Sequence, residues 1–353
     1  MCDSPAPAPN PRDFAVVVGI EDYKDAALGA LSGAKRDASE FSDWLCDPSG
    51  GGLPCSHVET ILSSVDGGDC KPAAFRVRNS FIRLLEAANL EEEPIGRRLY
   101  IFFAGHGAGN PDRIDEVGLL PAPYSDLQAW YVVGLHYVQE FQRLGAFEEI
   151  FLFMDCCRDE LPRHPLSFPL AVSLRNDPNA RSVRLFIGYA TEHNSKARER
   201  TFEDNEVHGV FSYSLLEALK DDQTWVGGEL TAQRLATYVA ARVLHHRPAG
   251  SRQVAKFPLS PDGIVVLSRD DQLTSKTRVR VRLPDPAAEL EVYWGGDLEN
   301  ALAVQTTQPT PGTVEFELDS GRLYLLGVPR GNGELHPASR RRIDGEEVTI
   351  ELR

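Results

Sequence analysis

The sequence predicts an α/β fold, with a mainly parallel sheet flanked by helices, followed by a small all-β, sandwich-like domain. As far as residue 268, short apolar runs alternate with amphipathic stretches. These apolar runs are continuous, which indicates strands that are buried on both faces by covering helices. After residue 270 the pattern changes to period-two runs separated by Pro, Gly, Asn and Asp, which is typical of antiparallel strands.

The segments of the first domain are taken as strands where they are short and apolar, and as helices where they are amphipathic. The runs expected to contain the strands are FAVVVGI (14–20), HVETIL (57–62), RRLYIFFAGHG (97–107), EEIFLFMDCC (148–157) and RLFIGYAT (184–191). The predicted helices are LSGAKRDASEFSDWLC (31–46), AFRVRNSFIRLLEAANL (74–90), HYVQEFQRL (136–144) and FSYSLLEALK (211–220).

Changes in composition predict the domain boundaries. Residues 1–13 are rich in Pro, Ala and Asn and have no apolar periodicity, so they are expected to form a disordered tail. The first domain is expected over residues 14–268, and the polar residues 269–276 are expected to form a linker. The small β domain then occupies residues 277–353, which is enough chain for a compact sandwich.

Composition argues against several classes of protein. A net charge of -15 disfavours binding to a nucleic-acid backbone, which requires clustered Lys and Arg. No apolar run approaches the roughly 20 residues of a membrane span, and the first residues lack the pattern of a signal peptide. We therefore expect a cytoplasmic protein with neither a nucleic-acid nor a membrane partner. The six cysteines are irregularly spaced and form no CxxC pair, which gives little support to a disulfide framework or a structural zinc site.

Two residues with catalytic chemistry directly follow predicted strands. His106 follows LYIFF within Ala104-Gly105-His106-Gly107, and Cys157 follows IFLFM. Ligand sites of parallel sheets lie beyond the carboxyl ends of the strands, so both side chains are expected at the same edge. An imidazole base beside a thiol is the pairing that nucleophilic catalysis by cysteine requires.

These motifs resemble the caspase and metacaspase family of cysteine peptidases. A caspase nucleophile lies in Q-A-C-[RQG]-G, about 50 residues after its histidine, and Asp155-Cys156-Cys157-Arg158-Asp159 occupies that place here. The pair GHG and DCC is still more similar to metacaspases, and the resemblance extends over residues 14–268. It implies a caspase-like peptidase domain of prokaryotic type, whose relatives often serve in stress, cell death or antiviral defence.

The resemblance also implies roles for individual residues. Cys157, rather than Cys156, matches the nucleophile, and His106 matches the base. The backbone N–H groups of Gly107 and Cys157 match the oxyanion hole. The resemblance therefore implies a cysteine endopeptidase, with the Cys157–His106 dyad hydrolysing peptide bonds.

The expected substrate is a protein or peptide with a basic residue at P1. Metacaspases have an acidic first pocket, and Asp37 and Asp155 match its two carboxylates. Paired carboxylates can hold a guanidinium in a bidentate manner, which favours Arg over Lys at P1.

Other features leave alternatives open. Arg158-Asp159-Glu160 stands where metacaspases have His-Ser-Gly, so a catalytically inactive caspase-like scaffold is the competing function. We expect no cofactor and no metal; the alternative is Ca²⁺, which many metacaspases need, at the acidic residues Asp112, Asp115 and Glu116.

Regulation is expected outside the catalytic motifs. Residues 159–184 and 197–206 could serve as a self-cleavage site, a lid or plain surface loops. The β domain contains no catalytic motif, so we expect it to dock a regulatory protein partner.

Overall fold

The computed structural model divides the chain into two compact units, one comprising Met1–Trp225 and Leu230–Leu267 and the other Val226–Glu229 and Ser268–Arg353. The described residues are 10–66, 68–91, 94–125, 129–161, 166–167, 183–203, 205–220, 229–258, 266–268, 276–286, 288–294, 307–319, 322–329, 335–343 and 347–352.

A five-stranded sheet, with every neighbouring pair parallel, forms the centre of the first unit. In spatial order its strands are β11 (Arg184–Tyr189), β9 (Phe147–Asp155), β5 (Gly96–Ala104), β1 (Phe14–Gly19) and β2 (Val58–Leu62). The predicted α/β fold with a mainly parallel sheet is thus confirmed.

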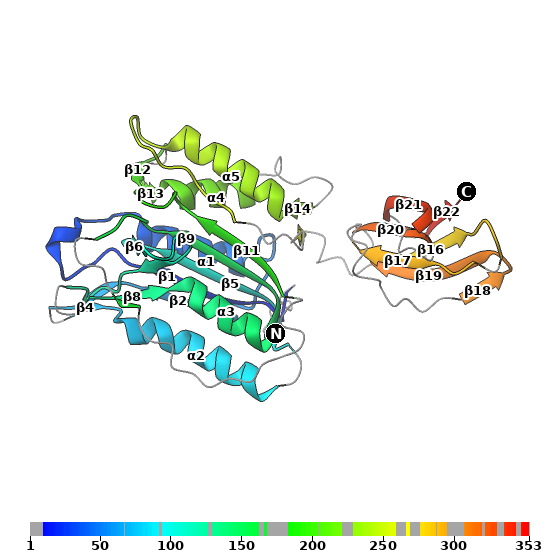
Figure 1. Ribbon diagram of the computed structural model, residues 1–353, viewed down its shortest axis with the longest axis horizontal. Helices are drawn as coiled ribbons and strands as arrows, with labels where there is room; N and C mark the ends of the chain where they lie inside the picture. The colour runs from blue at the N-terminus through cyan, green and yellow to red at the C-terminus, as the bar shows by residue number, and fades with distance from the viewer. Residues whose placement is uncertain are drawn as a thin grey trace, which may run out of the picture. The chain divides into compact units, whose positions relative to one another are not determined.

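Helices cover both faces of this sheet (Figure 1). They are α1 (Ala34–Cys46), α2 (Ala74–Leu90), α3 (Gly134–Leu144), α4 (Val210–Lys220) and α5 (Ala232–His246). Along β1, Ala15 and Val17 pack with α1, α4 and α5, whereas Val16 and Val18 pack with α2 and α3. This alternation explains the continuous apolar runs, since each face of a strand has its own core.

Helix α1 illustrates how the sequence determines these cores. Ala34, Ala38, Phe41 and Leu45 are all buried and recur at the spacing of one helical face. Gly33 provides no side-chain cap at the start of the helix. Instead, the carboxylate of Glu199 accepts hydrogen bonds from the backbone N–H groups of Ser32 and Gly33, at 3.0 and 2.9 Å. A distant segment therefore satisfies the backbone donors that immediately precede α1, and the N–H of Lys35 inside its first turn donates to Glu21 at 3.0 Å.

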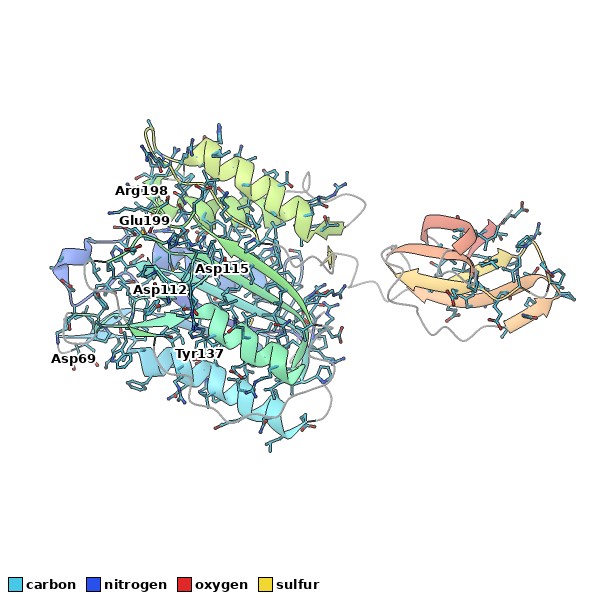
Figure 2. All side chains as sticks on the ribbon, viewed as in Figure 1. Asp69, Asp112, Asp115, Tyr137, Arg198 and Glu199 are labelled. Carbon is cyan, nitrogen blue, oxygen red and sulfur yellow. The ribbon has the colours of Figure 1, made fainter. Side chains whose placement is uncertain are left out.

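Several shorter elements connect the main ones. They are η1 (Ala26–Leu28), η2 (Cys55–His57), β3 (Ser64–Asp66), β4 (Asp69–Lys71), β6 (Gly107–Gly109), β7 (Val117–Leu119), β8 (Trp130–Val133), β10 (Leu166–Ser167), β12 (Glu199–Thr201), β13 (Val207–Gly209), β14 (Glu229–Thr231) and β15 (Val266–Ser268). The strands β12 and β13 form an antiparallel hairpin, and Figure 2 labels Glu199 at its start. Strands of two to four residues are too short to show a periodic pattern, so the sequence did not predict them.

The disordered tail predicted for residues 1–13 is wrong for residues 10–13. Asp13 is fully buried, and its carboxylate pairs with the guanidinium of Arg97 at 3.3 Å. The N–H of Asn10 donates to the carbonyl of Gly52 at 2.9 Å. Residues 10–13 therefore pack on the first unit, while residues 1–9 lie outside the described part of the chain.

The second unit contains two sheets around one core. One sheet has the order β18-β19-β16-β22 and the other β17-β20-β21. Their strands are β16 (Lys276–Arg282), β17 (Glu291–Trp294), β18 (Thr307–Thr310), β19 (Thr313–Asp319), β20 (Arg322–Pro329), β21 (Leu335–Ile343) and β22 (Glu347–Glu351). Val281 and Phe316 of the first sheet share a core with Val292 and Leu326 of the second, as in a sandwich. The expected linker lies outside the described residues, apart from Lys276.

No helix among the described residues has the length and apolarity that a membrane span requires.

Candidate active site

Strands β5 and β9 bring His106 and Cys157 to the same edge of the sheet. The two strands are adjacent and parallel, and Ala104 pairs with Asp155. His106 and Cys157 each lie two residues beyond that pair, so the imidazole and the thiol leave the sheet at the same level. This is the edge where the sequence placed both residues.

A backbone carbonyl sets the tautomer of His106. The ring nitrogen Nε2 lies 3.1 Å from the carbonyl oxygen of Gly29. A carbonyl can only accept, so Nε2 carries the proton and Nδ1 remains an acceptor. Burial lowers the pKa of the imidazole, opposed by the hydrogen bond to Gly29. His106 is therefore neutral at pH 7.

Tyr23 supports His106 from the end of β1. Its hydroxyl accepts a hydrogen bond from the backbone N–H of His106 at 2.8 Å, and the two rings lie 4.8 Å apart. Gly105, the preceding residue, has a φ of 152°, and a Cβ there would lie 2.6 Å from the Tyr23 hydroxyl. Glycine therefore allows this close approach.

The two neighbouring cysteines have different environments. The Sγ atom of Cys157 donates to the carbonyl of Ala197 at 3.7 Å, and burial together with Asp159 raises the pKa of this thiol to about 11. Cys156 is fully buried, and its Sγ donates to the carbonyl of Phe103 at 3.8 Å. Both thiols are neutral at pH 7, but Cys157 lines the cavity beside His106 whereas Cys156 belongs to the core. The described contacts include no hydrogen bond between Cys157 and His106.

The backbone N–H of Gly107 in β6 points away from the neighbouring strand β7. The carbonyl of His106 accepts from the N–H of Leu120, so the ladder bonds to β7 fall at residues 106 and 108. In an antiparallel ladder the intervening residue directs its N–H away from the partner strand. A Cβ on Gly107 would lie 2.9 Å from the carbonyl oxygen of Cys157, so this backbone runs directly beside Cys157.

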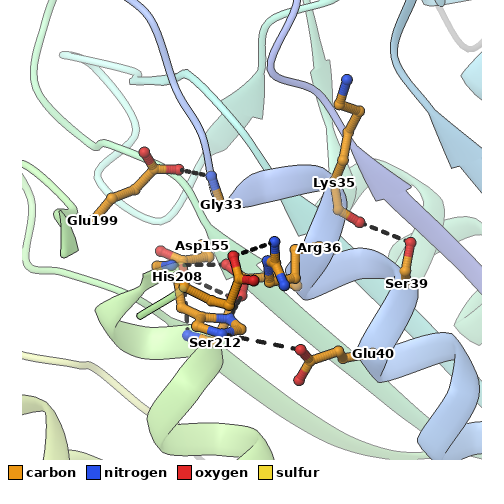
Figure 3. Close-up of polar contacts among 12 residues, drawn as sticks. Gly33, Lys35, Arg36, Ser39, Glu40, Asp155, Glu199, His208 and Ser212 are labelled. Atoms are coloured by element: carbon orange, nitrogen blue, oxygen red, sulfur yellow. Dashed lines mark hydrogen bonds and ion pairs between the residues drawn. The ribbon is translucent and has the colours of Figure 1, made fainter. Parts of the chain in front are cut away.

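Two carboxylates line the site, Asp37 of α1 and Asp155 of β9, and we call this pair its acidic floor. Figure 3 labels Asp155 together with His208 and Ser212. Asp37 Oδ1 lies 2.7 Å from Nδ1 of His208, and its Oδ2 accepts from the N–H of Gly209 at 2.8 Å. Asp155 Oδ2 accepts from the N–H and the hydroxyl of Ser212, at 3.0 and 2.7 Å.

Gly209 separates the two acids. A Cβ at this position would lie 2.2 Å from Asp155 Oδ2 and 3.1 Å from Asp37 Oδ2. Only glycine therefore lets the backbone of β13 approach both carboxylates.

Burial raises the pKa of both carboxyl groups. Asp37 is 1% exposed and Asp155 is 7% exposed. The pKa of Asp37 rises to about 7, because burial and the nearby Asp155 outweigh the hydrogen bonds from His208 and Gly209. The pKa of Asp155 rises to about 6, because burial outweighs the two hydrogen bonds from Ser212. Both acids therefore titrate close to neutral pH.

One cavity of about 440 Å³ connects these groups. Its lining includes all five residues to which the sequence assigned a catalytic or substrate-binding role: Asp37, His106, Gly107, Asp155 and Cys157. Charged residues that the sequence did not assign to the site also line it: Asp159, Lys196, Arg198 and Glu199.

The supporting residues His208, Gly209 and Ser212 also escaped the sequence analysis. The predicted helix FSYSLLEALK (211–220) contains Ser212, and His208 and Gly209 lie just before it. The sequence signal that could have identified them is a histidine and a glycine immediately before an apolar helix.

A model of the caspase domain family matches residues 12–259 of this chain. The chain belongs to the caspase domain family. A probable protease from a Desulfuromonadales bacterium is 28% identical to it over 217 residues, which is 59% of this chain. The chain spans 26% of the length of that relative. The crystal structure of caspase-1 from Spodoptera frugiperda is 14% identical, with a TM-score of 0.46, covering 73% of this chain and 91% of that one.

The acidic turn of this caspase domain is bonded internally. Glu116 Oε1 accepts from Arg113 at 2.7 Å and lies 3.2 Å from Nε2 of His136, while Oε2 accepts from Asn110 at 2.8 Å. Figure 2 labels Asp112 and Asp115 in the same turn. Over the described ranges, no three His, Cys, Asp or Glu side chains are grouped so that they could hold a metal ion.

Proposed function

We propose that this caspase domain is a cysteine endopeptidase that cleaves after basic residues and prefers Arg to Lys at P1. The observation that carries the proposal is the shared cavity, which places a thiol, an imidazole and two carboxylates around one space. Its volume of about 440 Å³ falls in the range of small-molecule pockets, so it can hold a single large side chain next to the reacting bond.

In the proposed reaction, Cys157 is the nucleophile and His106 is the general base. As the sulfur attacks the carbonyl carbon of the substrate, the thiol proton passes to Nδ1 of His106, which the bond from Nε2 to Gly29 leaves free. The imidazolium then donates this proton to the leaving amine, and an acyl-enzyme forms on Cys157. Water, deprotonated by His106, attacks the acyl-enzyme and releases the acid, and the proton returns to the thiol.

The neutral resting state determines when the proton moves. With the thiol pKa at about 11, the free enzyme holds thiol and imidazole rather than an ion pair. Proton transfer therefore accompanies the attack, and the developing oxyanion has to be stabilised at that moment. We assign this role to the N–H groups of Gly107 and Cys157, because fixed backbone donors need no reorganisation during the reaction.

The P1 pocket would use the acidic floor of the cavity. Asp155 Oδ2 is occupied by Ser212, whereas Oδ1 accepts no hydrogen bond from the described residues. A guanidinium that binds there gains a charged acceptor on Asp155 and the field of Asp37. The planar fork of Arg matches such acceptors better than the single ammonium of Lys.

A panel of fluorogenic peptides that differ only at P1 tests the proposal. We expect the largest kcat/KM for Arg, a smaller value for Lys, and very low values for Ala and Asp, with no turnover by Cys157→Ala. The panel is measured with and without Ca²⁺. Preference for Asp would contradict the pocket assignment, and no turnover of any peptide by the wild type would favour a non-catalytic scaffold.

A further inference from the structure

A buried arginine directly follows the proposed nucleophile. The side chain of Arg158 is 5% exposed, and burial lowers its pKa. Nη1 donates to the carbonyl of Thr191 at 3.1 Å, and Nη2 donates to the carbonyl of Ile114. The guanidinium carbon lies 4.4 Å from the centre of the Tyr189 ring. In the described part of the chain, no carboxylate lies within ion-pair distance of this cation.

Burying the guanidinium of Arg158 in this way costs folding free energy. Burying a charge is unfavourable without compensation, and Arg158 is compensated by carbonyl dipoles, an aromatic face and the more distant charges of Asp115 and Glu192. Its Nε is buried and has no hydrogen-bond partner among the described residues. An uncharged side chain would avoid this cost, so the two carbonyl bonds are expected to have a role of their own.

The first bond holds the segment that forms the wall of the cavity. Besides the bond to Thr191, the N–H of Arg158 donates to the carbonyl of Ser195 at 2.9 Å, and its carbonyl accepts from the N–H of Asn194 at 3.0 Å. The carbonyl of Ala197, two residues after Ser195, contacts the sulfur of Cys157. Arg158 thus fixes residues 191–197 through both its backbone and its side chain.

The second bond holds the turn between β6 and β7. Ile114 belongs to this turn, and the hydroxyl of Tyr189, beneath the guanidinium, donates to the carbonyl of Asp115 at 2.9 Å. The N–H of Gly109 donates to the carbonyl of Asp159 at 3.1 Å. The strand that carries Gly107 is therefore tied to the residues that follow the nucleophile.

We propose that Arg158 is a positioning residue that holds residues 110–116 and 191–197 at a fixed distance from the Cys157 sulfur. This inference rests on the proposed cysteine peptidase function. Arginine suits the role because its planar group donates in two directions at once, whereas a lysine ammonium is a single point charge. P1 binding depends on Asp37 and Asp155, which Arg158 does not contact among the described interactions. Loss of Arg158 should therefore lower kcat and leave KM nearly unchanged.

The test compares Arg158→Lys and Arg158→Met with Arg98→Lys as a control. Arg98 is also buried, but it pairs with Glu149 at the opposite end of β5. We expect both Arg158 variants to lose about 10- to 100-fold in kcat on an Arg peptide, with KM within about threefold of wild type. Hydrogen exchange should become about tenfold faster in residues 110–116 and 191–197, and Arg98→Lys should change neither quantity.

The outcomes separate this inference from the peptidase proposal. Wild-type kcat in Arg158→Lys, or unchanged exchange in either segment, would overturn the positioning role. Equal effects of Arg98→Lys would also overturn it, because general destabilisation would then explain the loss. If the wild type cleaves no peptide, the peptidase proposal fails, and the exchange measurement alone decides whether Arg158 holds both segments. If Arg158→Met does not fold, Arg158→Lys decides.

Discussion

The imidazole of His208 and the carboxylate of Asp37 lie 2.7 Å apart, and both side chains are almost completely buried. This contact joins the β12–β13 hairpin to the first turn of α1. A carboxylate oxygen of Glu40 lies 4.0 Å from the other ring nitrogen of His208. The proposed P1 pocket therefore depends on a hydrogen bond between residues 171 positions apart in the chain.

Replacing His208 should weaken recognition of a P1 cation. The hydrogen bond from His208 lowers the pKa of Asp37, so its loss leaves Asp37 more protonated at pH 7. In His208→Leu, whose side chain has no donor, we expect kcat/KM for an Arg peptide to fall about 10- to 100-fold, the value of one hydrogen bond to a charged group. The matched control is His57→Leu, since the ring of His57 stacks on Phe14 away from the cavity. An equal loss on a peptide with citrulline, the neutral isostere of Arg, would contradict this account.

Activity toward Arg should rise with pH across the range in which the pocket acids ionise. The pKa values of Asp155 and Asp37 are raised to about 6 and about 7. Below this range both carboxyl groups are protonated and cannot attract a cation; above it both are charged. We expect the ratio of kcat/KM for Arg and citrulline peptides to increase between about pH 5.5 and pH 8. His106 acts on both substrates, so its titration cancels in the ratio, and a flat ratio would rule out the acidic pocket.

Asp155→Asn should separate recognition from stability. An amide oxygen can still accept both hydrogen bonds from Ser212, but the pocket loses a charge. Losing one partner of a buried charge pair costs about 2–5 kcal/mol, so kcat/KM for Arg should fall roughly 30- to several-thousand-fold.

The stability of Asp155→Asn should not fall in parallel. Folding raises the pKa of Asp155 from 3.8 to about 6, so the unfolded chain ionises first and wild-type stability decreases as the pH rises through this window. At pH 8 the variant should therefore have a thermal midpoint equal to or above that of the wild type. A midpoint well below it would show that Asp155 is needed for folding.

The second unit should be dispensable for chemistry. Every residue that lines the cavity belongs to the first unit. A chain that ends at Ser268 should cleave a short Arg peptide with kcat/KM within about threefold of the full chain, while losing any regulatory protein that binds the β sandwich. Unfolding or inactivity of the shortened chain, measured by circular dichroism and peptide turnover, would show that the second unit completes the catalytic fold.

The sequence predicted the parts of the site that depend on strand ends. His106 and Cys157 follow long apolar strands, so a parallel sheet places both at one edge. Asp155 closes β9 and Asp37 lies in the first turn of an evident amphipathic helix. In each case a local pattern of nine or more residues determines the position.

The supporting contacts could not be predicted in this way. His208, Gly209 and Glu199 lie on a hairpin whose strands have three residues each, which leaves no periodicity to detect. Their partners are about 170 positions away, so only the folded chain reveals the contacts. The same holds for Arg158, which the sequence showed as a match to the caspase signature and a departure from the metacaspase pattern, without its partners.

The central claim is that Cys157 attacks a substrate whose P1 side chain occupies the acidic floor of the cavity. Its most direct test uses an irreversible acyloxymethyl ketone peptide with Arg at P1, followed by mass mapping of the labelled cysteine. We expect a single adduct on Cys157, retained in Cys156→Ala, absent in Cys157→Ala and His106→Ala, and at least about tenfold slower to form with a citrulline peptide. An adduct on Cys156, equal labelling of the exposed Cys55, or faster reaction of an Asp peptide would contradict the account.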